Sequence, residues 1–224
     1  MQTKKFVVLA VLFLLPITVY IFFASGKDNF VNLPTLSYGV TELNEFAPIS
    51  GDSVYFKNRI TVLSFFGNDI ESKKANAFNL AHKIYKKNYQ FSEFQFVTLI
   101  TEDQRTAALQ LKEKLAEIET PRNWRFVTGS TEAIEKVFNS LKSEYSLDSH
   151  WASDFVFIID KERNLRGRND DEDVGRLFGF DASNYAEINN KMSDDIKVVL
   201  AQYRLELKEY KADRKDAFRD RNLK

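Results

Sequence analysis

Three parts of this sequence carry side chains that could do chemistry: a histidine, an acidic run and a polar turn. His150 stands near Asp148 and Trp151, where a carboxylate could orient the imidazole as a general base, although no serine nucleophile is identifiably placed beside it. The acidic run at 170–173 offers oxygen ligands for Ca²⁺, but it lacks the glycine and the bidentate glutamate of an EF-hand loop. The favoured interpretation of this run is a solvated loop, which neighbouring arginines could neutralise.

The sequence contains no cysteine among its 224 residues. This excludes disulfides, thiolate nucleophiles, CxxC redox pairs and thiolate metal sites. A thioredoxin-type oxidoreductase or peroxidase is therefore disfavoured, because those reactions need a thiolate, and we expect a protein that is not an enzyme. With only two histidines, a site for a soft or borderline metal would also lack ligands, and we expect no cofactor.

Charge and composition narrow the class further. Lysine plus arginine equals aspartate plus glutamate at 32 each, so no overall field favours nucleic acid as a partner. Hydrophobic residues make up 44% of the chain and 20 of them are phenylalanine, which is ample for a packed interior. We expect one folded domain of ordinary size.

The N-terminal residues 1–26 predict a transmembrane anchor. Lys4 and Lys5 precede an apolar run at 6–24, which at helical rise spans roughly the 30 Å hydrocarbon core. Lysines before the helix favour a cytoplasmic N-terminus and an extracytoplasmic domain, which is periplasmic in a bacterium. A cleaved signal peptide is the alternative, since small residues stand at 24–26.

Strand and helix patterns alternate after the anchor and predict an α/β domain at 43–207, preceded by a linker at 27–42. Apolar, β-branched and aromatic runs predict strands at 60–66, 94–100, 124–128 and 155–160. Apolar residues at helical spacing predict helices at 71–88, 107–118, 134–141 and 196–207. Turn residues predict one hairpin around 50–52 and another where 161–164 leads into 165–168. The whole indicates a thioredoxin-like mixed sheet with helices on both faces.

The last helix is strongly amphipathic and is followed by an almost wholly charged tail at 208–224. Packing on the sheet is the expected role of its apolar face, with pairing to a second copy or contact with lipid as alternatives. The tail is either a solvated extension of the helix or frayed. The stretch 165–173 and this helix are the parts most expected to face a partner.

The residues resemble those of the SCO/SenC family, membrane-anchored thioredoxin-like proteins associated with copper delivery to cytochrome c oxidase. The resemblance covers roughly residues 40–168. It is carried by the strand at 60–66 running into the helix at 71–88, by Trp124-Arg-Phe-Val-Thr-Gly129, and by His150 before the strand at 155–160.

The resemblance also locates what this chain lacks. The family's copper ligands are a CxxxC motif at the turn after the first of these strands, plus the histidine. Here Asn68, Asp69 and Ser72 stand at the motif position, and His150 falls about two residues earlier than the family's ligand. Because Cu(I) prefers soft thiolate or thioether ligands, the resemblance implies a degenerate member that keeps the fold without its metal or redox chemistry.

From the residues alone, Asn68, Asp69 and Ser72 begin a helix and are expected to cap its first turn, with a docking surface for a protein partner as the functional alternative. The leading hypothesis is a redox-inactive interaction or accessory factor, in cytochrome c oxidase assembly by analogy with the family. The alternative is a metal-binding or metallochaperone role through His150 and the carboxylates at 170–173.

Overall fold

The computed structural model describes residues 2–25 and 32–221 of the chain. It divides into two units, residues 1–31 and 32–224. The first unit contains the helix α1 (Gln2–Ser25), whose described side chains are exposed. Its stretch Lys4–Ile21 is long and apolar enough to cross a membrane, by length and composition. A secretory signal would meet the same two conditions.

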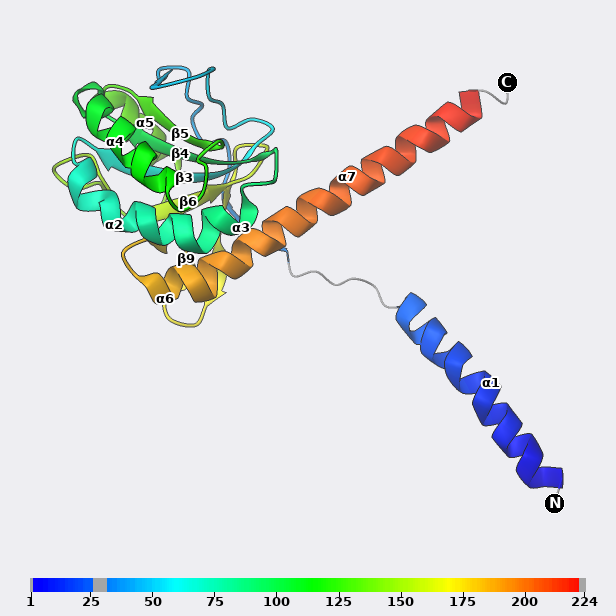
Figure 1. The fold of residues 1–224 in the computed structure, drawn as a ribbon. Coiled ribbons are helices and arrows are strands. Elements are labelled where there is room, and N and C mark those ends of the chain that lie inside the picture. The colour runs from blue at the N-terminus through cyan, green and yellow to red at the C-terminus, as the bar shows by residue number, and fades with distance from the viewer. Residues whose placement is uncertain (1, 26–31, 222–224) are drawn as a thin grey trace. The chain divides into compact units, whose positions relative to one another are not determined.

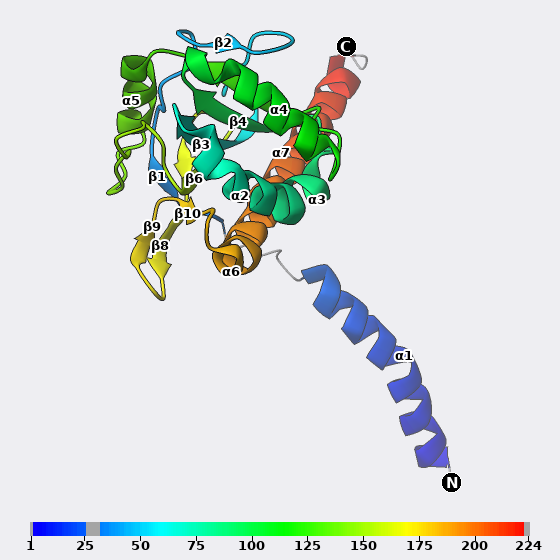
Figure 2. The ribbon, with the colours of Figure 1, turned by 60° about the vertical axis from the view of Figure 1, so that its left-hand side comes forward.

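The second unit is built on a mixed sheet of eight strands (Figures 1 and 2). Its centre is three parallel strands, β3 (Ile60–Gly67), β4 (Phe94–Ile100) and β5 (Trp124–Thr128). Beyond β3 the sheet continues antiparallel through β6 (Phe155–Ile159), β7 (Leu165–Arg166) and β1 (Thr35–Ser37). The remaining strands are β2 (Ala47–Pro48) beside β5 and β10 (Phe180–Asp181) beside β6. All four long strands and the second hairpin lie where the sequence predicted them.

Both faces of the sheet are covered, which explains why β3 and β4 are buried at every position. One face packs against α2 (Ile70–Leu80), α4 (Arg105–Ala116) and the start of α7 (Ser193–Arg221). The other packs against α5 (Thr131–Ser140), which Figure 2 shows on the opposite side of the strands from α2. Alternate residues of each strand point into the two cores, so Val62 faces the side covered by α2, α4 and α7, and Leu63 faces α5.

Short elements complete the unit. The helix predicted at 71–88 runs through α2, one π-helical turn and a last helical turn, η1 (Ala81–Tyr85) and α3 (Lys86–Asn88). A 3-10 turn, η2 (Glu102–Gln104), leads into α4. After the sheet come β8 (Arg168–Asp171), β9 (Gly175–Leu177), α6 (Tyr185–Glu187) and η3 (Ile188–Met192).

The start of α7 packs on the sheet, as its apolar spacing predicted. Ile196, Val199 and Leu200 are buried in the first core. The backbone stays helical to Arg221 (Figure 1), so the charged tail extends the helix as far as it is described. Its last residues, 222–224, lie outside the described residues.

The structure corrects the prediction before β3. The turn at 50–52 does not join two paired strands, because β2 pairs with β5 instead, with Ala47 opposite Thr128. The second apolar piece packs into the core through Val54 and Phe56 without forming a ladder. A strand containing Pro48 lacks one N–H donor and suits a sheet edge, which is where β2 lies.

The domain also begins earlier than the predicted boundary at 43. Within the predicted linker at 27–42, β1 joins the sheet and pairs with β7, while Leu33 and Val40 are buried. The rest of that linker, 27–31, lies outside the described residues. The boundary was missed because a three-residue strand is too short to show an apolar period.

Candidate functional site

The candidate site is the turn between β3 and α2, together with the loop that crosses it. Gly67 ends β3 with a φ of +51°, and a Cβ built on it would lie 1.9 Å from the carbonyl oxygen of His150. Only glycine lets the two backbones approach so closely. An isolated bridge between Phe66 and Ala152 continues the contact. The fold therefore brings the polar turn and His150 together across about 80 residues of sequence.

Two hydrogen bonds join Asn68 to His150. The backbone N–H of Asn68 donates to the carbonyl oxygen of His150 at 2.9 Å, and the side-chain oxygen Oδ1 of Asn68 lies 2.9 Å from Nδ1 of the imidazole. Because an amide oxygen only accepts, this contact assigns the proton to Nδ1 and leaves Nε2 of a neutral ring as an acceptor. His150 is exposed at the surface of this corner.

Asp69 caps the helix, as the sequence predicted. The side chains of Asn68 and Ser72, predicted to cap with it, bond elsewhere, Asn68 to His150 and Ser72 to the backbone carbonyl oxygen of Asp69. The side chain of Asp69 accepts the backbone N–H of Ser72 at 3.2 Å, which satisfies one of the free donors of the first turn of α2. Hydrogen bonding by Ser72, through its side chain and its backbone, lowers the pKa of the Asp69 carboxyl below its ordinary value of 3.8. Asp69 thus starts the helix, and Ser72 lies in its first turn.

Removing this cap is expected to cost a modest amount of stability. Asp69→Ala should lower the free energy of unfolding by about 1 kcal/mol at pH 7, measured by urea denaturation. Because the carboxyl pKa is lower in the folded chain than in the unfolded one, its contribution is present above pH 3.8 and lost as the pH falls further. The difference from wild type should therefore shrink in acid. A difference that stays constant down to pH 2 would show that the charged carboxylate is not what caps α2.

Asp148 does not orient the imidazole, so the general-base arrangement, which the sequence offered only as a disfavoured alternative, is not formed. Its carboxylate oxygen Oδ1 accepts the backbone N–H groups of His150 at 2.8 Å and Ala152 at 3.0 Å. The indole N–H of Trp151 donates to Glu135 at 2.8 Å. These contacts fix the shape of the loop and do not activate the imidazole of His150. Asp148 bonds to backbone N–H groups, and the bond to Glu135 is made by the neighbouring residue, Trp151.

Lys73 holds the same loop in place through Asp154 and Asp148. It is buried, and its ammonium donates to Asp154 at 2.8 Å and lies 3.8 Å from Asp148. Asn76 donates to the same oxygen of Asp154 at 2.8 Å. Burial opposes ionisation of Asp154, but the hydrogen bonds from Lys73 and Asn76 outweigh it and lower the pKa of its carboxyl. Sequence reasoning missed this support, since helical spacing placed Lys73 without indicating a partner 81 residues away.

The acidic run at 170–173 lies in the hairpin of β8 and β9, and two of its carboxylates, Asp171 and Asp173, are paired with cations. Asp171 is buried and lies 2.7 Å from Lys191, which also holds Asp173 at 2.6 Å. Arg168 lies 3.5 Å from Asp171 and makes two bonds of 2.8 Å to Asp195. Within residues 2–25 and 32–221, no three histidine, aspartate or glutamate side chains converge as a metal site. The joint site of His150 with this run is therefore not assembled among those residues.

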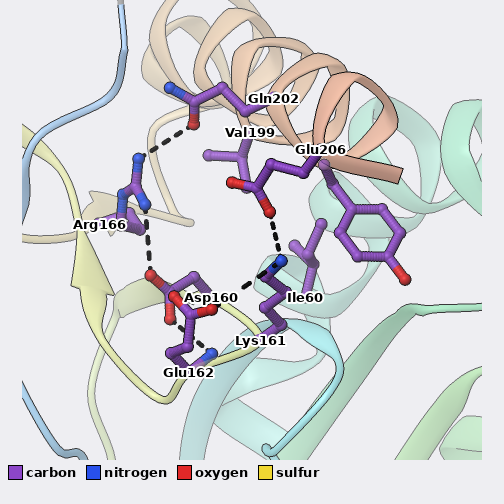
Figure 3. A pocket seen from close by; sticks show the side chains of 9 residues that line it. Ile60, Asp160, Lys161, Glu162, Arg166, Val199, Gln202 and Glu206 are labelled. Carbon is purple, nitrogen blue, oxygen red and sulfur yellow. Dashed lines mark hydrogen bonds and ion pairs between the residues drawn. The ribbon is translucent and has the colours of Figure 1, made fainter. Parts of the chain in front are cut away.

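A small cavity of about 30 Å³ lies between α7 and the turn after β6 (Figure 3). Arg166 crosses it, donating to Asp160 at 3.2 Å and to Gln202 at 3.0 Å, while Lys161 pairs with Glu206. Such a volume holds no more than a water or two. These contacts fasten α7 to the sheet.

Comparison with known proteins supports the architecture. No known family model matches the sequence, and no curated protein is related closely enough to match. A candidate electron transfer protein from Aquifex aeolicus VF5 aligns over 74% of this chain and 92% of its own, with 12% identity and a TM-score of 0.50. A candidate protein disulfide isomerase from Bacteroides thetaiotaomicron aligns over 76% and 95%, with 11% identity and a TM-score of 0.50.

A third solved structure is BsSco, a member of the Sco family of cytochrome c oxidase assembly proteins. It aligns over 75% of this chain and 98% of its own, with 14% identity and a TM-score of 0.48. At such identities a likeness concerns the fold. The unit formed by residues 32–224 has a thioredoxin-like fold, as the sequence predicted.

Proposed function

We propose that this chain is a membrane-anchored, extracytoplasmic accessory protein that binds another protein through the corner formed by Asn68, Asp69, Ser72 and His150. It does so without thiol chemistry and is not an enzyme. The single observation that carries the proposal is the pair of hydrogen bonds between Asn68 and His150, which join the half-buried turn at Asn68 to the exposed loop at His150. The anchor is α1, with Lys4 and Lys5 near its N-terminal end on the cytoplasmic side.

The chemistry of the corner supports binding over catalysis. Its side chains are an amide, a carboxylate, a hydroxyl and an imidazole, which are hydrogen-bonding groups suited to the polar rim of an interface. Lys73 and Asp148 hold the backbone of the loop from beneath, so the surface is formed before a partner arrives. A preformed surface loses less conformational entropy on binding.

The partner class follows from the sequence resemblance. Its carriers, the strand into helix at 60–88 and the phrase at 124–129, form β3, α2 and β5 around the corner. We therefore propose a component of a respiratory oxidase, or of its assembly apparatus, as the partner. This assignment rests on analogy with the family, because a shared fold does not by itself determine a function.

The test is affinity purification of the full chain from membranes of its own organism in mild detergent, with quantification of co-purified proteins. Wild type is expected to retain an oxidase component, and Asn68→Ala and His150→Ala are each expected to retain at least about tenfold less. The matched control is His82→Ala, which removes the other histidine from an exposed position on η1.

Three results would each contradict a different part of the proposal. If His150→Ala retained the partner as well as His82→Ala does, the corner would not be the binding surface. If no oxidase component co-purified, and a deletion strain kept normal oxidase activity, the respiratory assignment would be wrong while a different partner stayed possible. Insulin reduction by the wild-type chain above background would overturn the absence of redox chemistry.

A further inference from the structure

A second polar site lies at the other end of the central strands. A cavity of about 150 Å³ opens where β3, β4 and β5 begin, whereas the candidate site above lies where β3 ends. Its lining comes from the loop before β3 and from the first residues of β4 and β5: Ser53, Val54, Tyr55, Lys57, Arg59, Gln95, Asn123 and Arg125. All three charged residues in this lining are cations.

The floor of the cavity is the sheet itself. Further along the strands this face carries the apolar residues that pack against α5, such as Leu63, Val97 and Val127. At the start of the strands the same face changes to Thr61, Gln95 and Arg125, because side chains of one face recur at every second position. Polar residues thus replace the core where the sheet reaches the cavity.

The walls are held in place by hydrogen bonds. Gln95 is buried, and its side-chain amide donates to the carbonyl oxygen of Tyr55 at 2.8 Å and to the hydroxyl of Thr61 at 3.0 Å. The carboxylate of Glu42 accepts the backbone N–H groups of Phe56 at 2.7 Å and Lys57 at 3.2 Å. Arg59 donates to the carbonyl oxygen of Ser92. Glu42 therefore fixes the backbone at Lys57, and the bond to Ser92 uses one nitrogen of the Arg59 guanidinium.

Within the part of the chain that the structure describes, no ion pair involves Lys57, Arg59 or Arg125. The positive charge also affects a neighbouring lysine. Burial, and as a smaller cause the charge of Arg125, lower the pKa of the Lys112 ammonium. Gathering like charges is unfavourable unless an anion joins them.

We propose that this cavity binds a small oxyanion, either free phosphate or the phosphate group of a small phosphomonoester. Guanidinium groups match tetrahedral oxyanions with paired N–H donors, and a lysine adds a compact point charge. Arg59, Arg125 and Lys57 supply these groups from two sides of one cavity. The site is independent of the corner at Asn68 and His150, so it holds whether or not the proposed protein partner is correct.

The experiment is isothermal titration calorimetry on the full chain in a neutral detergent at constant ionic strength. Inorganic phosphate and glycerol 3-phosphate are titrated separately, which distinguishes a free ion from a phosphomonoester. Wild type is expected to bind one equivalent saturably. Arg125→Gln and Arg59→Gln are each expected to weaken binding by about tenfold to a hundredfold, because each removes hydrogen bonds to a charged group.

The matched control is Lys197→Gln, which removes one positive charge from an exposed position on α7 outside the cavity lining. It is expected to leave binding unchanged. Equal weakening by Lys197→Gln and Arg59→Gln would show general charge attraction and overturn the site, as would the absence of saturable heat with both ligands. Arg59 is exposed, so its variant tests the site even if Arg125→Gln disturbs the fold.

Discussion

Gly67→Ala is expected to lower the free energy of unfolding by about 2–5 kcal/mol, the largest effect of any single methyl group added to this chain. Two costs combine. The backbone at Gly67 has a φ of +51°, which L-residues rarely adopt. The new Cβ would also lie 1.9 Å from the carbonyl oxygen of His150 and 2.6 Å from the carbonyl carbon of Trp151, which are backbone atoms that cannot rotate away. Urea denaturation followed by tryptophan fluorescence measures the loss.

Gly39→Ala is the matched control, because it separates the two costs. Gly39 has a φ of +71°, yet a Cβ there would meet nothing within 4 Å. Its replacement should cost only the backbone term, about 1 kcal/mol. If the two variants lost equal stability, the close packing of the His150 loop on the β3 turn would be refuted. If the His150 loop packs on the β3 turn as described, Gly67→Ala should also shift the NMR resonances of the His150 imidazole, because the loop must move.

Arg168→Met is expected to lower the free energy of unfolding by about 3 kcal/mol, because it leaves Asp195 without its partner. Asp195 is buried, and both of its oxygens accept hydrogen bonds of 2.8 Å from the guanidinium of Arg168. Hydrogen bonding to Asp195 raises the pKa of Arg168 above its ordinary value, so the guanidinium is charged at pH 7. Thermal and urea denaturation at pH 7 measure the cost.

Two further variants decide whether the cost comes from the stranded charge. Asp195→Asn in the Arg168→Met background should recover part of the lost stability, because the buried carboxylate is gone. Lys197→Met breaks the exposed pair with Asp194 on the same helix and should cost about 0–1 kcal/mol. No recovery in the double variant would mean that Arg168 acts through packing of its aliphatic stem and not through the ion pair.

The long strands and helices were predictable because their signals are local. A strand buried on both faces, such as β3, is a continuous apolar run, and an amphipathic helix shows its buried side in its spacing. Asp69 as a helix cap is local in the same sense, since the residue and the donor it satisfies are three positions apart. The prediction of a hairpin around 50–52 was wrong because β2 pairs with β5, a strand about 80 residues away in the sequence.

Most of the candidate site lay beyond such local reasoning. The ion pair of Lys73 with Asp154 joins residues 81 positions apart, and the contact of Asn68 with His150 joins residues 82 apart. The disfavoured general-base alternative for His150 rested on nearness in sequence to Asp148, yet the loop turns that carboxylate toward backbone N–H groups. The three cations of the cavity are likewise separated by up to 68 residues, from Lys57 to Arg125, and no pattern in the sequence connects them.

By itself, the sequence determined an apolar N-terminal helix, an α/β domain of alternating strands and helices, and the exclusion of every thiol-dependent chemistry by the lack of cysteine. Those conclusions need only residue types and spacings along the chain. The tertiary structure alone decided which polar groups meet: the joined corner at Asn68 and His150, the neutralised acidic run beside Arg168 and Lys191, and the cationic cavity where the parallel strands begin. The physical reason is that parallel strands bring residues far apart in sequence to one edge of a sheet, where electrostatic interactions depend on distance in space.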